Sequence, residues 1–261
     1  MNTIKLDGNS LTLQALIEVS RNGAKVALSD DAIQRMQASR QLVEDYVNEE
    51  RVVYGITTGF GLFADVVISK EQTKLLQKNL ILADCCSMGD PYKDEVVRAA
   101  MLLRINALAK GFSGIRLSTV QLLIDMLNCG IHPIIPEQGS VGASGDLSPL
   151  AHIVLVMLGS GEARYKGEIV EGLEALKKEG LEPVELVSKE GLALINGTCV
   201  LTAVGALATY DAIKVLKLAD ISASMTVEAL SGIIDAYDEK IHLARPHQGQ
   251  IQVAQNMLQI L

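Results

Sequence analysis

Apolar residues recur at helical spacing through most of the chain, and short polar or glycine-rich stretches separate the runs. This spacing predicts amphipathic helices that bury one face. The predicted helices cover residues 29–51, 69–82, 94–109 and 118–129. Ser29 and Ser69 stand where helix N-caps are expected, and Gly130 stands where a C-terminal cap is expected. Elsewhere we expect a strand and helix over residues 6–18, a loop over 52–61 and an extended, turn-rich segment over 133–146.

The pattern changes after residue 146. Ser148 followed by Pro149 predicts a helix N-cap and first turn, and the run to residue 158 is apolar enough to be buried on all sides. Residues 166–185 are mostly polar and show no single period, which indicates a small segment that protrudes at the surface. Residues 198–234 are rich in Ala, Gly and Leu and predict long, closely packed helices, and the end of the chain is again helical in pattern.

One stretch, residues 191–210, contains no charged side chain and is long enough to span a bilayer. However, Asn196, Gly197 and Thr198 lie in its middle, and their polar groups would be costly in lipid. We therefore expect a loop that leads into a buried helix, and no membrane as a partner.

Composition narrows the class of protein. Hydrophobic residues make up 49% of the chain but aromatic residues only 3%, which favours packed helices with an aliphatic core. The net charge of −8 argues against nucleic acid as a partner. Four cysteines without Cys-x-x-Cys spacing suit a reducing cytoplasm, and the first residues do not resemble a signal peptide. No spacing typical of metal ligands occurs.

The most distinctive chemistry lies in Ala143-Ser144-Gly145. The amide nitrogen of Gly145 can attack the carbonyl of Ala143, because small side chains leave the approach open and glycine permits a strained turn. Loss of water from the ring and from Ser144 would then leave methylidene-imidazolone, an electrophile that needs no metal and no added coenzyme. An electron sink of this kind is otherwise imported as a cofactor.

The loop has three alternative interpretations. A phosphate cradle is disfavoured because no Gly-Lys-Ser or Gly-Lys-Thr follows the glycines. An acyl-transfer serine is disfavoured because Gly-x-Ser-x-Gly is absent. A plain glycine-rich turn remains a structural alternative.

Residues 139–154 resemble, position for position, the signature of the aromatic amino acid ammonia-lyases and aminomutases, and the resemblance covers nearly the whole chain. Its other segments are Tyr54-Gly55-Ile56-Thr57-Thr58-Gly59-Phe60-Gly61, Asn106-Ala107-Leu108-Ala109-Lys110-Gly111, Ser113-Gly114-Ile115-Arg116, Leu194-Ile195-Asn196-Gly197-Thr198 and Arg245-Pro246-His247. The family implies a mainly α fold like that of the L-aspartase and fumarase lyases. Residues 1–197 would form an N-terminal domain with minor β content around the cyclising loop, and residues 198–261 would begin a long-helix bundle.

The resemblance implies a carbon–nitrogen lyase that removes ammonia from an aromatic L-amino acid. Tyr54 matches the family's base, although the pKa of a free phenol, about 10, would have to fall; its structural alternative is a packed loop tyrosine. Asn196 would hydrogen bond near the electrophile, and Asp146 would orient the turn, with helix N-capping as the alternative for both. The helix starts at Ser148 and after Thr198 would converge on the electrophile and polarise it.

Two positions bear on the substrate. Asp84 stands where histidine-active members of the family carry His, so it would favour a cationic or hydrogen-bond-donating ring over a bare phenyl. Histidine, which would give urocanate, is therefore the favoured substrate. The resemblance also assigns Leu194 to specificity. His132, His242 and His247 are weaker candidates, and His152 is expected to be a satisfied core residue.

Members of the family are considerably longer than this chain. Their later Tyr-Ser-x-Arg segment, which binds the substrate carboxylate, has no counterpart here, and their active sites are shared within a helical homotetramer. The resemblance therefore implies little or no turnover by this chain alone. Two alternatives stay open: an aminomutase with the same electrophile, and a non-catalytic truncated homologue that associates through its apolar helices.

Overall fold

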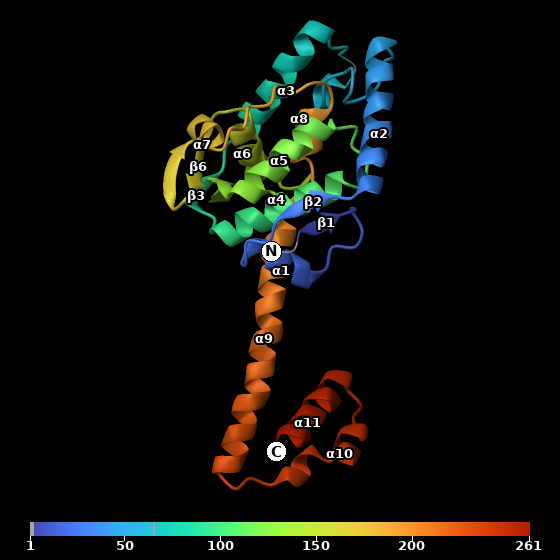
Figure 1. Ribbon diagram of the computed structural model, residues 1–261. Helices are drawn as coiled ribbons and strands as arrows, with labels where there is room; N and C mark the ends of the chain where they lie inside the picture. Colours follow the sequence, from blue (N-terminus) through green and yellow to red (C-terminus); the bar gives the residue numbers. More distant parts are fainter. Residues whose placement is uncertain (1–2, 65) are drawn as a thin grey trace. The chain divides into compact units, whose positions relative to one another are not determined.

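The computed structural model describes residues 3–64 and 66–261 (Figure 1). Contacts divide the chain into two compact units, Met1–Gly205 and Ala206–Leu261. Both are built mainly from α-helices, as predicted, with a few short strands in the first unit.

The first unit opens with two short strands and two helices. These are β1 (Ile4–Leu6), α1 (Leu13–Ser20), β2 (Val26–Leu28) and α2 (Asp30–Asn48), and β1 pairs with β2 in parallel. The hydroxyl of Thr12 accepts a hydrogen bond from the amide of Ala15, and that of Ser29 accepts one from Ala32. Both serve as N-caps, since they satisfy amides that lack partners in the first helical turn.

Five helices form the core of this unit. They are α3 (Lys70–Asp84), α4 (Asp94–Leu108), α5 (Leu117–Cys129), α6 (Leu147–Met157) and α8 (Glu190–Ile195). α4 packs against α5 and α1, while α3, α6 and α8 contact one another (Figure 1). The helices predicted from periodicity are confirmed, and Ser69 caps α3 as expected. α8 was not predicted, because six residues are too few to show a helical period.

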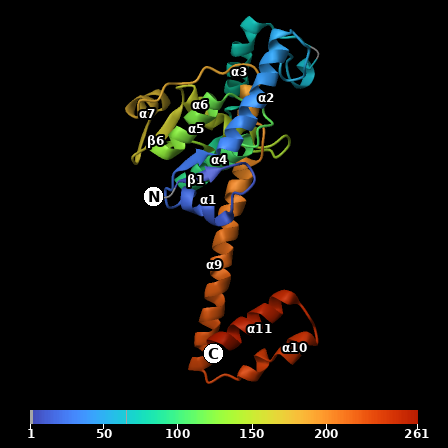
Figure 2. The same cartoon turned by 45° about the vertical axis from the view of Figure 1, so that its right-hand side comes forward.

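The remaining elements of this unit are small. The 3₁₀ turn η1 (Gly61–Phe63) precedes α3; β3 (Met88–Pro91) pairs with β5 (Pro136–Gln138), and β4 (Ile131–Pro133) pairs with β6 (Glu162–Tyr165), which pairs with β7 (Glu168–Glu171). All three pairings are antiparallel. α7 (Gly172–Lys178) follows, and Figure 2 shows it beside β6, away from α2. The polar stretch 166–185 thus contains the end of a hairpin and a short helix.

The predicted start of α6 is wrong by two residues. Asp146 is the N-cap residue, Leu147 is the first helical residue, and Ser148 already lies inside the helix. The burial of α6 is confirmed for most of its residues, with Leu147, His152 and Leu155 partly exposed. The Ser148 hydroxyl accepts a hydrogen bond from the amide of Cys86 and lies 2.7 Å from the Ser87 hydroxyl, so it fastens the chain after α3 instead of capping α6.

A single helix, α9 (Cys199–Ala229), replaces the several closely packed helices expected after residue 198. Its first turns are buried at Val200, Ala203 and Leu207, but Leu201 and Leu216 are each 66% exposed. The prediction of close packing is therefore wrong for the described part of the chain. A helix that is apolar on every side needs neighbours on every side, and within the described residues much of α9 is exposed, although Ser224 near its end is buried.

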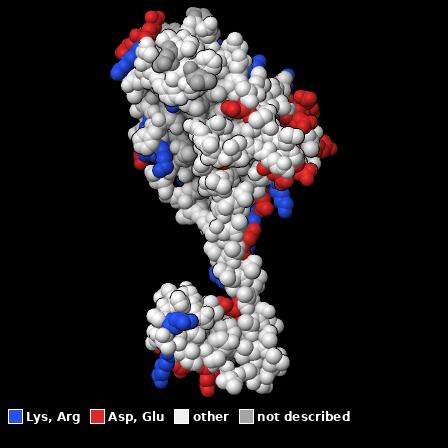
Figure 3. Space-filling model, turned by 180° about the vertical axis from the view of Figure 1, so that it is seen from behind, with Lys and Arg blue, Asp and Glu red and all other residues white. Residues whose placement is uncertain are grey.

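The second unit also contains η2 (Ile234–Tyr237), α10 (Glu239–Leu243) and α11 (Gln248–Ile260). Within this unit Ser224 of α9 donates to the sulfur of Met257 on α11 at 3.3 Å. Figure 3 shows wide areas of one face without charged side chains. By length and composition the segment Glu190–Ala229 could cross a membrane, but helices inside soluble cores pass the same test. The turn between α8 and α9 also interrupts it.

Candidate active site

The loop before α6 makes a tight turn at the three residues predicted to cyclise. Gly142 and Gly145 face each other in an isolated antiparallel bridge, which places Ala143 and Ser144 at the tip of the turn. Ser144 has a φ of 66°, a left-handed conformation that costs free energy in a residue with a side chain. The turn therefore carries the backbone strain that ring closure would use.

Gly145 is required at its position for two reasons. Its φ of 97° disfavours any residue with a side chain, and a Cβ atom there would lie 2.4 Å from the carbonyl oxygen of Gly197. The amide of Asp146 donates to the same oxygen at 2.6 Å. The chain between α8 and α9 is thus pressed directly against the turn.

Asp146 is 1% exposed, and its carboxylate joins the turn to α9. Oδ2 accepts the amides of Val200 and Leu201, each at 2.9 Å, and Oδ1 accepts the hydroxyl of Ser140 at 2.6 Å. One carboxylate therefore caps the first turn of α9 and fastens the loop at Ser140. Helix capping, the structural alternative for Asp146, is observed, although its side chain caps α9 and not α6. Its role in orienting the turn for cyclisation stays a prediction.

Asn196 reaches the turn from the other side. Its side-chain amide donates to the carbonyl oxygen of Ser144 and lies 3.3 Å from the Ser144 hydroxyl. Asn196 is the C-cap residue of α8 and does not cap α9, so its structural alternative is wrong. The N-termini of α6 and α9 meet at the turn as predicted, because Asp146 begins the one and binds the amides of the other. Helix N-termini favour negative charge nearby.

Tyr54 lies in a loop that is held mainly by its own residues. The hydroxyl of Thr57 accepts the amide of Val53 at 2.9 Å, and that of Thr58 accepts the amide of Gly55 at 3.1 Å. The ring of Tyr54 is 60% exposed, so it is not the packed loop tyrosine of the structural alternative. Within the described residues, its hydroxyl accepts a long hydrogen bond from Gly61 and makes none to the turn.

Asp84 and Leu194 occupy different environments. Asp84 ends α3, and partial burial raises the pKa of its carboxyl group. Ser87, shortly after Asp84, packs against the loop that precedes α6. A Cβ atom at Gly139 of that loop would lie 2.0 Å from the Ser87 hydroxyl oxygen. Leu194 is 1% exposed and packs in the core.

One histidine differs from what the sequence led us to expect. His152 is partly buried, and its Nε2 is buried without a hydrogen-bond partner within the described residues, so the prediction of a satisfied core residue is wrong. Burial lowers the pKa of His152. His132 pairs through Nδ1 with Asp94 at 3.1 Å and contacts Arg98 through Nε2 at 3.0 Å. Neither lies in a group of metal-ligating side chains within the described part of the chain.

Two supporting residues were missed in the sequence. Ser140 binds Asp146, and the lack of a side chain at Gly197 leaves room for Arg104, since a Cβ atom there would lie 2.3 Å from Nη1 of that residue. The signal for Gly197 was its place between Asn196 and Thr198, in a segment already singled out. Ser140 carried no comparable signal, because a lone serine beside glycines is common in turns.

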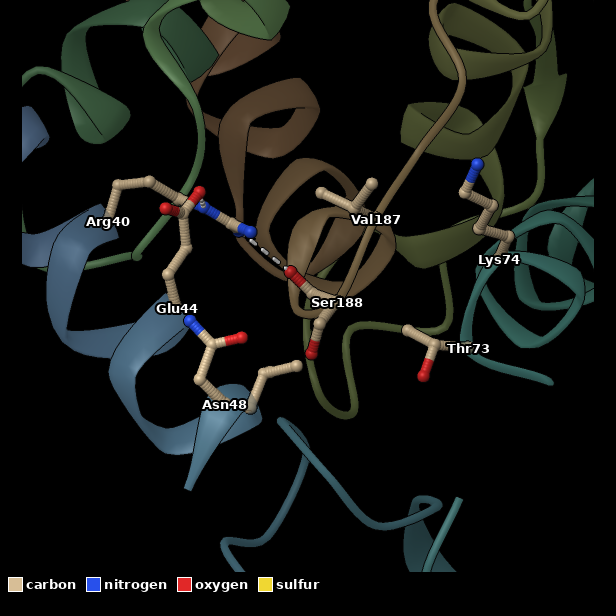
Figure 4. A pocket seen from close by; sticks show the side chains of 8 residues that line it. Arg40, Glu44, Asn48, Thr73, Lys74, Val187 and Ser188 are labelled. Carbon is tan, nitrogen blue, oxygen red and sulfur yellow. Dashed lines mark hydrogen bonds and ion pairs between the residues drawn. The ribbon is translucent and has the colours of Figure 1, made fainter. Parts of the chain in front are cut away.

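A separate cavity of about 260 Å³ lies between α2, α3 and the segment before α8 (Figure 4). Arg40 reaches across it and donates to the carbonyl oxygen of Ser188 at 3.0 Å. The Ser188 hydroxyl donates in turn to the carbonyl oxygen of Ile56, in the loop that carries Tyr54. This wall of the cavity therefore supports that loop.

Known proteins match along almost the whole chain. The sequence pattern of the family described as aromatic amino acid lyase matches residues 11–261. The chain is 58% identical over 261 residues to a histidine ammonia-lyase of Alkaliphilus metalliredigens, covering 100% of this chain and 52% of that protein.

Solved structures give the same result. The crystal structure of histidine ammonia-lyase from Trypanosoma cruzi has a TM-score of 0.93 at 41% identity and covers 98% of this chain and 50% of that one. Phenylalanine aminomutase of Pantoea agglomerans has a TM-score of 0.92 at 37% identity, with 99% and 50% covered. The chain thus spans about half the length of the proteins it matches.

Proposed function

Because this chain belongs to the aromatic amino acid lyase family, we propose that the complete protein is an ammonia-lyase that releases ammonia from an aromatic L-amino acid, with histidine favoured. The observation that carries the proposal is the strained turn at Ser144, which Asn196 grips and which lies between two helix N-termini. Backbone strain of this kind costs free energy and is found mainly at functional sites, which supports a chemical role for the turn.

The electrophile would be made from the turn itself. The amide nitrogen of Gly145 bonds to the carbonyl carbon of Ala143, and the carbonyl oxygen leaves as water with hydrogens from the amides of Gly145 and Ser144. Ser144 then loses its hydroxyl and its Cα hydrogen as a second water, which leaves methylidene-imidazolone with an exocyclic methylene. The geometry fits, because the bridge between Gly142 and Gly145 closes the turn that bond formation requires.

Once formed, this group supplies an acceptor for the substrate amine. The residues of this chain then have distinct tasks. The Asn196 amide donates a hydrogen bond to the oxygen of residue 144, and the N-termini of α6 and α9 add partial positive charge that favours electron density there. Tyr54 would take the β-proton of the substrate. These groups need no metal and no added coenzyme.

Asp84 supports histidine as the substrate. A carboxylate at this position can accept the N–H of an imidazole ring, and a phenyl ring offers no such donor. The high identity to a protein named histidine ammonia-lyase points the same way, and the product would be urocanate. Asp84→Leu should therefore raise KM for histidine more than KM for phenylalanine, while Leu194, which is buried in the core, would shape the site only indirectly.

We further propose that the active protein is a homotetramer in the cytoplasm and that this chain alone has little or no turnover. The exposed apolar side chains of α9 support assembly, because such surfaces are usually covered. The four free cysteines agree with a reducing compartment.

The decisive experiment compares the intact mass of the complete protein with that encoded by its sequence. Cyclisation predicts a mass lower by two water molecules, and Ser144→Ala should keep the full encoded mass. Histidine should then give a strongly absorbing unsaturated acid with the unaltered protein only. An unshifted mass in the unaltered protein would refute the proposal and favour a non-catalytic homologue.

An aminomutase is the second candidate, and the likeness to phenylalanine aminomutase favours it. It would return ammonia to the β-carbon of the substrate. Chromatography of the products separates the two activities, since a β-amino acid would replace free ammonia and the unsaturated acid.

A further inference from the structure

Arg104 is a buried cation that the reaction described above does not use. It lies on α4, is 6% exposed, and has no carboxylate within ion-pair distance among the described residues. Its guanidinium instead donates to the carbonyl oxygens of Ala193 and, at 3.0 Å, of Asn196. A buried charge is costly unless hydrogen bonds satisfy it, so this placement calls for an explanation.

The two carbonyls lie on either side of the end of α8, whose last residue is Ile195. Carbonyls at a helix C-terminus lack partners within the helix and carry partial negative charge, which a cation stabilises. The planar guanidinium can bind both oxygens at once, whereas the single ammonium of a lysine cannot reproduce this fork. Arg104 therefore fixes the point at which the chain leaves α8.

That point decides where Asn196 aims its side chain. Asn196 has extended backbone angles directly after the helix, and its amide donates to Ser144. If the backbone carbonyl of Asn196 were released from Arg104, the residue could rotate and the contact with Ser144 would weaken.

Gly197 provides a second connection. A Cβ atom there would lie 2.3 Å from Nη1 of Arg104, and a Cβ atom at Gly145 would lie 2.4 Å from the oxygen of Gly197. Gly197 is therefore held between the guanidinium on one side and the turn on the other. Gly197 alone therefore connects Arg104 on α4 with Gly145 in the turn.

We propose that Arg104 is a positioning residue for formation of the electrophile, acting through Asn196 and Gly197. It holds the two residues after α8 in place. Asn196 can then donate its hydrogen bond to the oxygen of Ser144, and Gly197 lies against the backbone of Gly145. The proposal rests on the proposed function in one respect, namely that the turn cyclises.

The test measures how fast newly made complete protein loses the mass of two waters, and compares Arg104→Lys with Arg98→Lys. Arg98 is a matched control, because it is a buried arginine of the same helix whose guanidinium also donates to carbonyls, those of Val19 and Leu127. Both variants should lose similar thermal stability. Only Arg104→Lys should cyclise more slowly, by about tenfold.

A double-mutant cycle with Asn196→Ala shows whether Arg104 acts through Asn196. Residues that act through one contact lose less together than the sum of their separate losses, so the double variant should cyclise scarcely more slowly than Asn196→Ala. If Arg104→Lys does not fold, Gly197→Ala tests the same path with Arg104 in place and should also slow cyclisation. In molecules that have cyclised, Arg104→Lys should lower kcat with little change in KM.

The outcomes separate the two proposals. If the unaltered protein never loses the two waters, the proposed function fails and this inference with it. If the unaltered protein cyclises and Arg104→Lys does so at the same rate, or if Arg98→Lys is slowed as much, the positioning role alone is refuted.

Discussion

The two loops that carry the proposed electrophile and the proposed base are built in opposite ways. The loop around Ser144 is fastened by side chains and backbone from other helices, through Asp146 and Asn196. The loop around Tyr54 is fastened chiefly by its own threonines, with one bond from Ser188. Gly145 is buried, whereas Tyr54 is 60% exposed.

The difference indicates which part of the proposed chemistry this chain would organise by itself. The turn that would cyclise has its supports within the described residues, while the Tyr54 hydroxyl makes a single long hydrogen bond there. This agrees with a chain that spans about half the length of the proteins it matches.

Of the changes that test the contrast between the two loops, Tyr54→Phe should have the largest effect, which is on kcat. Loss of a general base costs about 10²–10⁴-fold in rate, so kcat of the complete protein should fall by that factor. The intact mass should still show cyclisation, and the melting temperature should hardly move because the hydroxyl makes a single long hydrogen bond. A variant that failed to cyclise would show that the two loops depend on each other.

Asp146→Ala should destabilise the loop and the start of α9 together. Loss of hydrogen bonds to a buried carboxylate costs roughly 1.5–3 kcal/mol, measurable as a lower free energy of unfolding in urea. Ser140→Ala is the control, because it removes one of those bonds and leaves α9 capped. Equal losses in the two variants would contradict the role given to the α9 cap.

Gly145→Ala and Gly142→Ala separate backbone strain from contact. Both glycines have positive φ, but a Cβ atom at Gly142 meets nothing within 4 Å, while at Gly145 it meets Gly197. Strain costs about 1–3 kcal/mol at either site, so Gly145→Ala should be the more destabilised of the two. Equal melting temperatures would mean that the chain after α8 does not press on the turn.

The smallest expected effect is a dependence of stability on pH, and it comes from His132, which lies in neither loop. Burial lowers the pKa of His132 despite the opposing charge of Asp94, with Arg98 and Arg164 also lowering it. The neutral ring is therefore favoured in the folded state, and its contribution to stability is present above the unfolded pKa of about 6.5 and lost as pH falls below it. Melting temperatures measured from pH 8 to pH 5 should show this fall.

His132→Gln should reduce that dependence without abolishing it, because burial lowers the pKa of His152 as well. A variant with an unchanged pH profile would show that His132 does not titrate in this range.

The sequence predicted what depends on local spacing. The helices up to α6 follow from apolar periodicity and caps such as Ser29 and Ser69, which act within one turn. The chemistry of Ala143-Ser144-Gly145 was also readable, because the small side chains are adjacent in the chain. Apart from the strand expected near Leu6, the strands were not, since three or four residues cannot establish an alternating pattern.

What the sequence could not show depends on residues far apart. Asp146 stands at the N-cap position of α6, but its carboxylate accepts amides of α9, and no local pattern predicts which amides a carboxylate will bind. Arg104 meets Asn196 only because the fold brings a side chain of α4 to the end of α8. The apolar composition of α9 indicates that this helix needs neighbours. It does not indicate which residues, if any, will cover it.

The bond between Asp146 and Val200 joins residues 54 positions apart, and this has a consequence for synthesis on the ribosome. The turn leaves the exit tunnel before the residues that secure it exist. At about 5–20 residues per second, the delay is roughly 3–11 s. During that interval the bond from Val200 to Asp146 cannot form, so the nascent chain would lack this support for the turn until the start of α9 has been translated.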